Sequence, residues 1–576
     1  MRPVCSHRVS QLCLDGSFLS YRSYRLRVRY LTNSKAAPHD RGNPNRTFSS
    51  GRVYGSNTSD GNTNKLPRWN RIDEIKNASS NPYPRLAVSP QSTSCEHFRS
   101  QYNHIQPNET LDDVSVFLYG RIRSQRTAGS KLVFFDLWQD GHKVQILCNQ
   151  RILGVTGVSP ERFREFYHLL QRGDVYSITG KPHRTGRGEL TLLASELPTL
   201  LSPCLHDVPV DTKEHAVSPY ERHVQFLADP GVADILRARS SIVQHIRNFF
   251  LERRFIEVNT PIIAAAAGGA IARPFHTTAS ESVEQLLALR IAPELWLKRL
   301  IVGGFDRIFE IGPSFRNEGL DKTHNPEFTT CEFYQAFADL ECLMQMTETL
   351  LSGLSQNIRE LNEKLGTLHP IYVDFSTPFR RIDFVPALES AMGHTLPDLK
   401  SDGATLKMVE LLNTMSIPLP DHVSLPRLLD KLCAVYLEPQ CKDPTFIINH
   451  PECMSPLSKS YIHPTCSQVV SARAELFVEG KEVVNTYEEE NSPFEQRRKF
   501  EEQLSYRDPE NPGELDESYL QALEWGLPPT GGWGCGIDRL CMLFTGARRI
   551  GDVLSFGNLR SVTRPHTSVY PRESGS

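Results

Sequence analysis

The first long pattern in the chain is an alternation of apolar and polar residues that begins near Leu111. Because successive side chains in a strand point to opposite faces, this pattern predicts short strands. An Asp-Gly pair at residues 140–141 predicts a tight hairpin turn between the second and third strands. Five short strands, with one helix between the third and fourth, predict an OB-fold barrel, a fold that commonly binds single-stranded nucleic acid. The predicted strands are residues 114–119, 131–137, 143–147, 175–179 and 189–193, and the helix is residues 161–170.

The second half of the chain mixes helical periods with alternating segments. Residues 201–223 are rich in proline and have no period, which predicts a linker. After Pro230, apolar residues recur at helical spacing from Ile235 to Phe250, and a short strand at residues 255–258 follows. Strands separated by helical inserts predict an antiparallel sheet in an α+β domain. Its other predicted strands are residues 307–311, 328–334, 474–478 and 482–489, with a long helix at residues 340–361.

The composition agrees with a soluble globular protein of several domains. The chain has 576 residues, of which 39% are hydrophobic and 23% are charged. It has no run of 18 apolar residues, so we expect no membrane-spanning helix. The 13 cysteines show neither paired nor metal-binding spacing, which predicts free thiols in a reducing compartment.

The first 65 residues differ from the rest in charge. They contain eleven Lys and Arg residues and three Asp residues, a net charge of +8, which leaves −11 for residues 66–576 of a chain whose total is −3. An Arg-rich, Ser-rich and acid-poor N-terminus is typical of a mitochondrial transit peptide. A disordered tail that binds RNA is the alternative. The acidic remainder neither supports nor excludes a nucleic-acid partner, because a local basic face can lie on an acidic protein.

Charged side chains occur where the predicted sheet should be apolar. In the strand at residues 328–334, Phe328, Glu332 and Tyr334 share one face, together with Thr330. An aromatic ring, a carboxylate and a phenol on one face suit a surface that stacks a base at one end and binds a cation at the other. A half-exposed strand with one solvated glutamate is the alternative.

A second candidate is a hairpin with two carboxylates. If Glu479-Gly480 forms a two-residue loop, Glu482 faces Phe477, and Glu475 lies on the same face one step along. Two such close carboxylates repel each other unless a cation lies between them, and a hard divalent ion with phosphates suits the pair. The alternative is a solvated surface pair. Residues 485, 487 and 489 have the opposite parity to Glu482, so all of them could face one site only if the strand contains a bulge.

The glycine-rich residues 531–536 lie next to Arg539. They match neither the GxGxxG pattern nor a P-loop. Glycines allow close approach of the backbone, and the guanidinium of Arg539 is suited to a phosphate.

Taken together, these segments resemble class II lysyl-tRNA synthetases from about Leu66 to Gly557. Residues 255–261, 315–332 and 531–539 resemble the three motifs of that class. Residues 268–275, 289–300 and 331–334 resemble the lysyl member rather than the aspartyl or asparaginyl ones. The basic leader and local drift resemble the fungal mitochondrial type.

The resemblance implies an antiparallel sheet flanked by helices, preceded by an OB domain that binds the anticodon. It implies ATP-dependent activation of L-lysine, transfer to the 3′ end of tRNA(Lys), Mg²⁺ as cofactor, a homodimer and a location in the mitochondrial matrix. The expected parts are a leader (1–65), a helical extension (66–110), the OB domain (111–204), a linker (205–229) and the catalytic domain (230–576).

The resemblance also implies a role for individual residues. Arg316 would hold the ATP α-phosphate and the substrate carboxylate, and Arg539 the γ-phosphate end. The other expected contacts are Glu318, His324, Asn325 and Phe328 for ATP; Gly268, Glu294, Glu332, Tyr334, Asn485 and Glu489 for lysine; Glu475 and Glu482 for Mg²⁺; and Arg121, Phe134, Gln145 and Glu189 for the anticodon.

Some positions depart from the family pattern. The family usually has Glu-Leu-Asn-Asp-Pro where this chain has Glu-Glu-Asn-Ser-Pro at residues 489–493, and the usual acidic segment before the third motif is replaced at residues 505–516. Cys331 and Cys535 lie beside the expected site without a base partner, which favours a packing role.

Three alternatives remain at this point. An enzyme for aspartate or asparagine would need a basic pocket, which Glu332 and Glu489 disfavour. A non-catalytic RNA-binding relative is disfavoured by the presence of Arg316 and Arg539. An enzyme that lysylates a translation factor is disfavoured by the OB region, since such enzymes resemble the catalytic domain alone.

Overall fold

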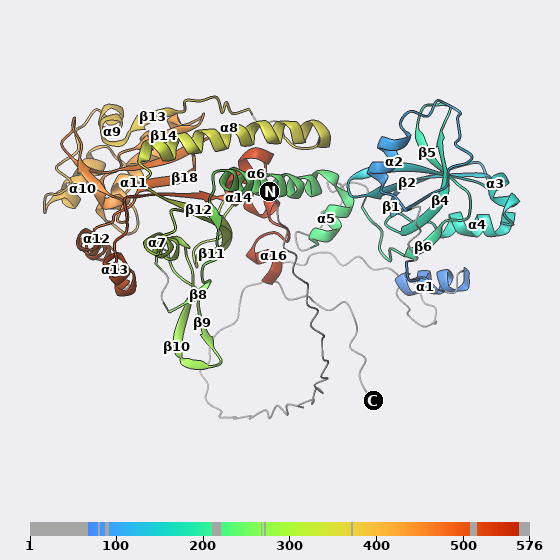
Figure 1. Ribbon diagram of the computed structural model, residues 1–576, viewed down its shortest axis with the longest axis horizontal. Coiled ribbons are helices and arrows are strands. Elements are labelled where there is room, and N and C mark those ends of the chain that lie inside the picture. The colour runs from blue at the N-terminus through green and yellow to red at the C-terminus, as the bar shows by residue number, and fades with distance from the viewer. Residues whose placement is uncertain are drawn as a thin grey trace, which may run out of the picture. The chain divides into compact units, whose positions relative to one another are not determined.

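The computed structural model describes residues 67–78, 81–86, 92–209, 221–265, 268–269, 272–369, 372–506 and 515–563 (Figure 1). The predicted leader, residues 1–65, lies outside the described residues, as does most of the drifted segment 505–516. Helix α1 (Pro67–Ala78) includes the short helix expected after the leader.

The first folded part is a closed β-barrel, and the predicted OB-fold is confirmed. Its strands follow the order β1-β2-β3-β5-β4, and β1 also pairs with β4, which closes the barrel. Helices α3 and α4 lie between β3 and β4 in sequence, where one helix was predicted. The bounds are β1 Val116–Ala128, β2 Leu132–Gln139, β3 His142–Asn149, α3 Gln150–Val155, α4 Pro160–Leu169, β4 Val175–Arg184, β5 Leu190–Ala194 and β6 Thr199–Ser202, with α2 Cys95–Tyr102 before them.

The predicted alternation is visible in β2. Val133, Phe135 and Leu137 are buried in the barrel core, whereas Phe134 and Trp138 point outward and are half-buried. The predicted hairpin turn is also present, because Gln139 pairs with His142 across residues 140 and 141, which both have positive φ. Asp and Gly tolerate that conformation well, and it matches the twist of the flanking strands.

An eight-stranded sheet forms the centre of the second folded part. Within the described residues its order is β13-β14-β17-β18-β19-β12-β11-β7. The strands from β14 to β11 are antiparallel, as predicted, while the edge strands β13 and β7 pair in parallel with their neighbours. The bounds are β7 Ile256–Glu257, β11 Arg307–Phe315, β12 Glu327–Ala336, β13 Arg380–Asp383, β14 Thr445–Ile448, β17 Arg473–Val478, β18 Lys481–Glu488 and β19 Thr530–Gly536.

One face of this sheet is covered by helices and the other carries polar groups. Helices α6 (Pro230–Glu252) and α8 (Leu340–Leu365) bury their apolar sides against Phe333 of β12 and Trp533 of β19. The two rings stack with centroids 5.2 Å apart. By alternation, Glu332 and Tyr334 face the opposite side, together with Gly532, Gly534 and Gly536 of β19.

Cys331 and Cys535 are cross-strand partners in the covered layer and are fully buried. Burial raises the pKa of both thiols, so they remain neutral packing groups. The packing role expected from the sequence agrees with this placement.

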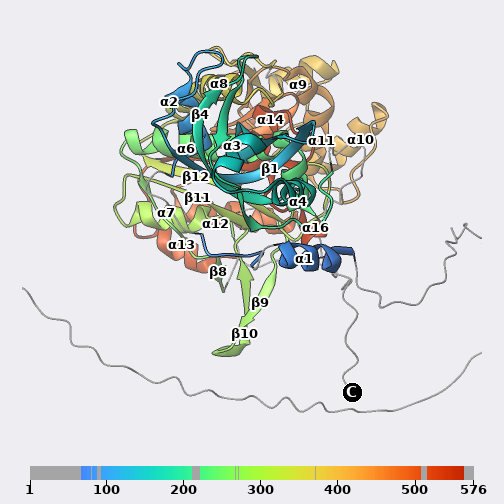
Figure 2. The same ribbon diagram turned by 90° about the vertical axis from the view of Figure 1, so that its right-hand side faces the viewer.

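Smaller elements surround the sheet. Figures 1 and 2 both show β9 and β10 as a hairpin that extends away from the large sheet. The remaining bounds are α5 Arg222–Ala228, β8 Ile263–Ala264, β9 His276–Ala279, β10 Ser282–Leu289, α7 Glu294–Val302, α9 Phe384–Met392, α10 Ala404–Thr414, α11 Leu425–Tyr436, η1 Glu438–Gln440, η2 Glu452–Met454, β15 Ser460–Ile462, β16 Val469–Ser471, α12 Pro493–Ser505, α13 Glu517–Leu523, α14 Ile537–Thr545, α15 Ile550–Val553 and α16 Leu559–Thr563.

A buried ion pair joins α6, β12 and α14. Arg239 Nη1 lies 2.5 Å from Asp538 Oδ1, and the other carboxylate oxygen accepts from the amide of Thr329 at 2.8 Å. Arg239→Met would leave the buried Asp538 charge without its partner, which costs about 3–5 kcal/mol. We therefore expect a clear drop in the calorimetric Tm of this domain.

The matched control for that change lies on the same helix. Arg247 pairs with Glu257, but both side chains are about one-third exposed (32% and 31%). Solvent screens such a pair, so Arg247→Met should cost less than about 1 kcal/mol. Equal losses of Tm from the two variants would contradict a central role for Arg239.

Candidate active site

A bulge in β18 brings the two sets of predicted residues into one site. Phe477 pairs with Glu482 as predicted, but Leu476 pairs with Val484, so Val483 is an extra residue in β18. The inserted residue changes the parity of the strand. Glu482 and Asn485, which a regular strand would point to opposite faces, consequently line the same cavity.

That cavity lies on the polar face of the sheet and has a volume of about 460 Å³. Its wall contains most of the residues predicted for ATP and lysine. Those that line it are Glu294, Arg316, Glu318, His324, Asn325, Phe328, Glu332, Tyr334, Glu482, Asn485 and Arg539.

One end of the cavity is basic and aromatic. The guanidinium of Arg316 lies over the Phe328 ring, 5.1 Å from its centroid. Arg539 Nη2 lies 2.9 Å from His324 Nε2, and its Nη1 donates to the Glu482 backbone oxygen at 3.1 Å. Two guanidinium groups beside a half-buried aromatic ring that lines the cavity suit a polyphosphate attached to a base.

Asn325 and Glu318 differ in how firmly they are held. Asn325 Oδ1 accepts from the amide of Leu559 at 3.0 Å, and its Nδ2 donates to the Glu327 backbone oxygen at 2.6 Å. Glu318 is exposed at the rim. Asn325 therefore fixes a loop as well as lining the cavity.

The two carboxylates predicted for a metal ion lie near this end. Glu475 forms an ion pair with Arg473 and contacts His450 Nε2 at 3.1 Å. Burial raises the pKa of Glu475, but Arg473 and His450 bring it down to about 2. Burial and the charge of Glu475 raise the pKa of Glu482.

This donor set fits a hard divalent cation. A cation beside Glu482 would relieve the like-charge repulsion that raises its pKa. Among the described residues no group of three or more His, Cys, Asp or Glu side chains has metal-binding geometry. Phosphate oxygens and water would therefore have to complete the coordination, which suits Mg²⁺.

The opposite end of the cavity is closed and acidic. Glu294 is the first residue of α7, where the helix dipole favours a carboxylate. Its Oε1 accepts from Tyr487 Oη at 2.6 Å and from Lys298 Nζ at 2.6 Å. The ammonium of Lys298, which is 0% exposed, also forms an ion pair with Glu489 Oε2.

Glu332 and Glu489 differ in their access to the cavity. Glu332 lines it, and Tyr334 Oη donates to its Oε2 at 3.3 Å. Burial and the nearby charge of Glu294 raise the pKa of Glu332 to about 8. Glu489 is only 1% exposed and lies behind the lining, and its Oε1 has no hydrogen-bond partner among the described residues.

Two glycines explain how these carboxylates fit. A Cβ at Gly532 would lie 1.9 Å from Glu489 Oε1, so only glycine leaves room for that carboxylate. A Cβ at Gly268 would lie 2.5 Å from Leu295 Cδ1. The backbone of Gly268 therefore lies against Leu295 of α7, and a Cβ at the next residue, Gly269, would lie 3.3 Å from Glu294 Cβ.

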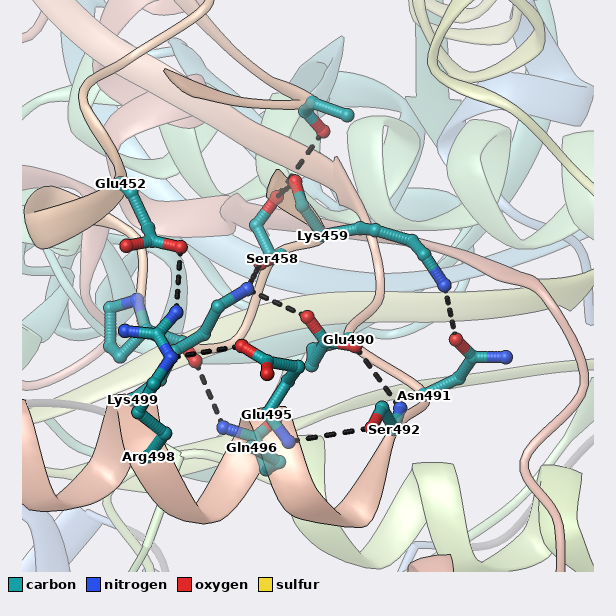
Figure 3. A network of polar contacts seen from close by, with 12 residues as sticks. Glu452, Ser458, Lys459, Glu490, Asn491, Ser492, Glu495, Gln496, Arg498 and Lys499 are labelled. Atoms are coloured by element: carbon teal, nitrogen blue, oxygen red, sulfur yellow. Dashed lines mark hydrogen bonds and ion pairs between the residues drawn. The ribbon is translucent and has the colours of Figure 1, made fainter. Parts of the chain in front are cut away.

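Behind the closed end, a polar network fixes helix α12 to the loop that pairs with the end of β18 (Figure 3). Lys499 of α12, 3% exposed, bonds Glu490 Oε2 at 2.7 Å and the Ser458 backbone oxygen at 2.6 Å. The backbone of Ser458 forms a bridge with Glu489. Glu490 stands where the family usually has leucine, so Lys499 supplies the counter-ion that this departure requires.

On the barrel, the structure brings together some of the predicted anticodon residues. Phe134 lies under the guanidinium of Arg126, 5.0 Å from its centroid, and Arg126 Nη2 donates to Gln145 Oε1 at 2.7 Å. Arg121 lies apart from them, opposite Trp138 near the other end of the β1–β2 ladder, and bonds the Gly173 backbone oxygen at 2.5 Å. Glu189 is exposed and lies 3.6 Å from Lys143.

Sequence reasoning assigned no role to three residues of these sites, although it had placed Tyr487 on the same face as Asn485 and Glu489. Arg126 could have been found by pairing β1 with β2 around Gly129, because it then faces Phe134. Tyr487 shares parity with Glu489, which was a usable signal. Lys298 follows Glu294 by one helical turn, and this i, i+4 spacing places the two side chains on one side of α7.

Comparisons with known proteins agree with this geometry. A family model described as tRNA synthetases class II (D, K and N) matches residues 215–560, more than half of the chain, and an OB-fold nucleic acid binding domain matches residues 116–200. A mitochondrial lysine–tRNA ligase of Schizosaccharomyces pombe is 40% identical over 488 residues, which cover 83% of this chain and 91% of the relative. The chain belongs to the class II lysine–tRNA ligases.

Other lysine–tRNA ligases are similar to this chain over comparable lengths. One from Cladosporium cladosporioides is 40% identical over 85% of this chain and 83% of its own length. One from Deinococcus radiodurans is 36% identical over 79% and 84%. The resemblance seen in the sequence is thus confirmed, and the alternatives of an aspartate or asparagine enzyme and of a non-catalytic relative are set aside.

Class II synthetases use ATP as substrate, and this lysine–tRNA ligase shares their catalytic domain. The described helices include none that combines the length and apolar character needed to cross a membrane.

Proposed function

We propose that this lysine–tRNA ligase charges tRNA(Lys) for translation in the mitochondrial matrix. Two observations support the location: the net charge of +8 on residues 1–65 and the similarity to a mitochondrial ligase of Schizosaccharomyces pombe. Microscopy of the full chain and of a chain that lacks residues 1–65 tests it. Absence of mitochondrial signal from the full chain would contradict the location, and signal that persists without residues 1–65 would contradict their role as the targeting segment.

The closed acidic end of the cavity is the lysine pocket in this proposal, and it is the observation that carries the assignment. Glu332, Tyr334 and Glu489 receive the ε-ammonium, with Asn485 beside them, while Glu294 and the Gly268 backbone receive the α-ammonium. Buried carboxylates left unpaired by an uncharged amino acid penalise that amino acid, by about 10⁴-fold in favourable cases.

ATP occupies the basic end. Phe328 stacks on the adenine, with Glu318, His324 and Asn325 around the nucleotide, and Arg539 holds the γ-phosphate end. Arg316 holds both the α-phosphate and the lysine carboxylate, which brings the nucleophile and the phosphorus into line. The carboxylate oxygen attacks the α-phosphorus, pyrophosphate leaves, and lysyl-adenylate forms.

Glu475 and Glu482 would hold Mg²⁺, which neutralises charge on the phosphates when bound. Neither guanidinium needs to transfer a proton, so this step depends on positioning and electrostatic stabilisation. In the second step a ribose hydroxyl of the tRNA attacks the acyl carbon and releases AMP.

The barrel binds the anticodon in this proposal. Phe134 offers a stacking face, and Gln145, Glu189 and Arg121 are the polar contacts, with Arg126 added by the structure. A homodimer is proposed through α6 and β7. Ile256 of β7 is 49% exposed, and the nearby Ile262 and Ile263 are also exposed, which supplies an apolar edge for a second copy.

The assignment of the pocket is tested by ATP–pyrophosphate exchange on the full chain with Mg²⁺ and each of the twenty amino acids. Lysine alone should support exchange, and Arg316→Ala should abolish it. Exchange with a different amino acid would overturn the pocket assignment while leaving the fold intact.

The raised pKa of Glu332 predicts a pH dependence. Its carboxyl must lose a proton to pair with the ε-ammonium, and a pKa of about 8 means that it holds this proton at neutral pH. The value of kcat/KM for lysine should therefore rise about tenfold per pH unit from pH 6 and level off near pH 8. Exchange assays between pH 6 and 9 measure it, and a plateau already below pH 6.5 would contradict it.

A further inference from the structure

Lys298 is a fully buried lysine inside a pocket that is itself proposed to bind lysine. Its ammonium lies 2.6 Å from Glu294 Oε1 and also forms an ion pair with Glu489 Oε2. No role in the reaction was expected for it from the sequence. A buried charge needs a compensating partner, and here the partners are two of the proposed substrate-binding carboxylates.

The groups that face the Lys298 ammonium come from every element packed against it. Besides Glu294 of its own helix, Tyr487 of β18 and Glu489 just beyond that strand approach from one side. The rings of Tyr334 on β12 and Tyr519 on α13 lie 5.8 and 6.0 Å away. Burial raises the pKa of all three phenols, so they stay neutral, and among the described residues Glu294 and Glu489 are the anions that form an ion pair with the ammonium.

A count of charges shows what the ammonium does for the pocket. Within the part of the chain that the structure describes, the carboxylates of Glu294, Glu332 and Glu489 meet at the closed end with the ammonium of Lys298. Substrate lysine brings two ammonium groups, and its carboxylate is assigned to Arg316. The occupied pocket is then neutral, whereas without Lys298 it would keep one buried negative charge.

The contacts of Glu489 show where the substrate fits. Its Oε2 pairs with Lys298, while its Oε1 has no hydrogen-bond partner among the described residues and lies against Gly532, which lines the cavity. One oxygen is thus held by the protein and the other is left for the ligand. Burial raises the pKa of Glu489 well above its ordinary value, and the contact with the Lys298 ammonium opposes that rise.

We propose that Lys298 is a positioning residue for the amino-acid substrate: its ammonium holds the carboxylates of Glu489 and Glu294 in place to receive the ammonium groups of lysine, and its charge favours the ionised form of Glu489. The proposal rests on the proposed function of this pocket. The proposal differs from a purely structural role. A residue with only a structural role would affect stability, whereas Lys298 should also change how binding of the substrate lysine depends on pH.

Calorimetry on the wild-type protein tests this without any substitution. Lysine binding measured at pH 6.5 in buffers of different ionisation enthalpy gives the number of protons released. If Lys298 keeps Glu489 ionised, only Glu332 has a proton to lose, and the release should be roughly one proton or fewer per lysine. Release of two protons would overturn the proposal.

Lys298→Met should convert Glu489 into a second protonated carboxyl in the empty pocket. The value of kcat/KM for lysine at pH 7 should fall on the order of 10²-fold. The slope of its logarithm against pH between 6.5 and 8 should increase from about 1 to about 2. KM for ATP should change less than about twofold, because the basic end of the cavity is untouched.

Lys499→Met is the matched control. Lys499 is likewise buried, and its ion pair with Glu490 lies one residue from Glu489, but it bonds α12 to the loop behind the pocket (Figure 3). This variant should lose thermal stability while its pH slope stays at about 1. A slope of 2 in both variants would overturn the specific role of Lys298.

The double variant Lys298→Met/Glu489→Gln keeps the test decisive if the single variant fails to fold. Removing both charges avoids an unpaired buried carboxylate. If Lys298 acts through Glu489, the double variant should match Glu489→Gln alone in kcat/KM for lysine within about threefold, since the effects are then not additive. Additive losses would overturn the proposal.

The outcomes also separate this proposal from the proposed function. Wild-type protein that shows no lysine-dependent exchange would overturn the pocket itself. Normal wild-type exchange with an unchanged pH slope in Lys298→Met would overturn only the role of Lys298.

Discussion

Glu332→Gln should lower kcat/KM for lysine in ATP–pyrophosphate exchange on the order of 10³-fold. The carboxylate is 8% exposed and lines the cavity, so the substrate ε-ammonium meets it in a poorly solvated environment. Gln keeps the shape and loses the charge. The same variant should be more stable than the wild type without ligand, because the pKa of Glu332 is raised from its ordinary 4.5 to about 8.

The sign of that stability difference follows from proton binding. Between pH 4.5 and 8 the folded wild type retains a proton on Glu332 that the unfolded chain releases, so the free energy of unfolding falls as the pH rises. Gln does not titrate. The Tm advantage of Glu332→Gln should therefore grow from pH 5 to pH 8, as measured by calorimetry.

Glu310→Gln is the matched control, because Glu310 is the cross-strand partner of Glu332 on β11. Glu310 Oε1 pairs with Arg290 at 2.6 Å, and loss of its charge leaves that buried guanidinium without its counter-ion. This variant should lower Tm, opposite in sign to Glu332→Gln. Full lysine exchange by Glu332→Gln would contradict the pocket assignment.

Gly532→Ala should raise KM for lysine on the order of 10²-fold, since a displacement of about 1 Å in a reacting site can have that effect. The new Cβ would lie 1.9 Å from Glu489 Oε1 and 2.7 Å from Tyr334 Cε1, so the carboxylate must move. The nucleotide contacts lie at the other end of the cavity. KM for ATP in the same exchange assay should change less than about twofold.

Gly531→Ala separates a pocket effect from general crowding. Its Cβ would lie 2.9 Å from Leu343 Cδ1 and 3.0 Å from the Ala338 backbone oxygen, in the covered core rather than in the pocket. Overpacking there costs about 1–3 kcal/mol. We expect a lower Tm with KM for lysine near the wild-type value, and equal effects of both alanines on KM for lysine would argue against a steric role for Gly532.

The sequence predicted the sheets because their signals are local. The strand at residues 131–137 and the Asp140-Gly141 turn were predicted, and in the structure Val133, Phe135 and Leu137 of that strand lie in the barrel core. The pairing of Phe477 with Glu482 was predicted in the same way from the Glu479-Gly480 loop. Each of these inferences depends on residues close together in the chain.

The contents of the pocket were harder to predict because they join distant segments. Glu482 and residues 485, 487 and 489 could face one site only if β18 contained a bulge, so a bulge could be predicted. Only the pairing of β17 with β18 in the structure identified Val483 as the extra residue. The ion pair joins Lys298 of α7 to Glu489 just after β18, and strands β11 to β18 and helices α8 to α11 lie between them in the chain, so no spacing rule reveals it. The separation of Arg121 from Phe134 likewise needed the β1–β2 ladder.

The bulge at Val483 divides β18 into two parts, and the alternation of side chains in one part is independent of that in the other. In the proposed assignment, the residue before the bulge that lines the cavity, Glu482, lies at the phosphates, and Asn485 after it lies at the amino acid. Substitutions on one side leave the orientation of the other side unchanged, because the register shift is confined to a single residue. A chain with this strand can therefore change which amino acid it selects while its nucleotide chemistry stays the same, and deletion of Val483 would exchange the inward and outward faces of one half.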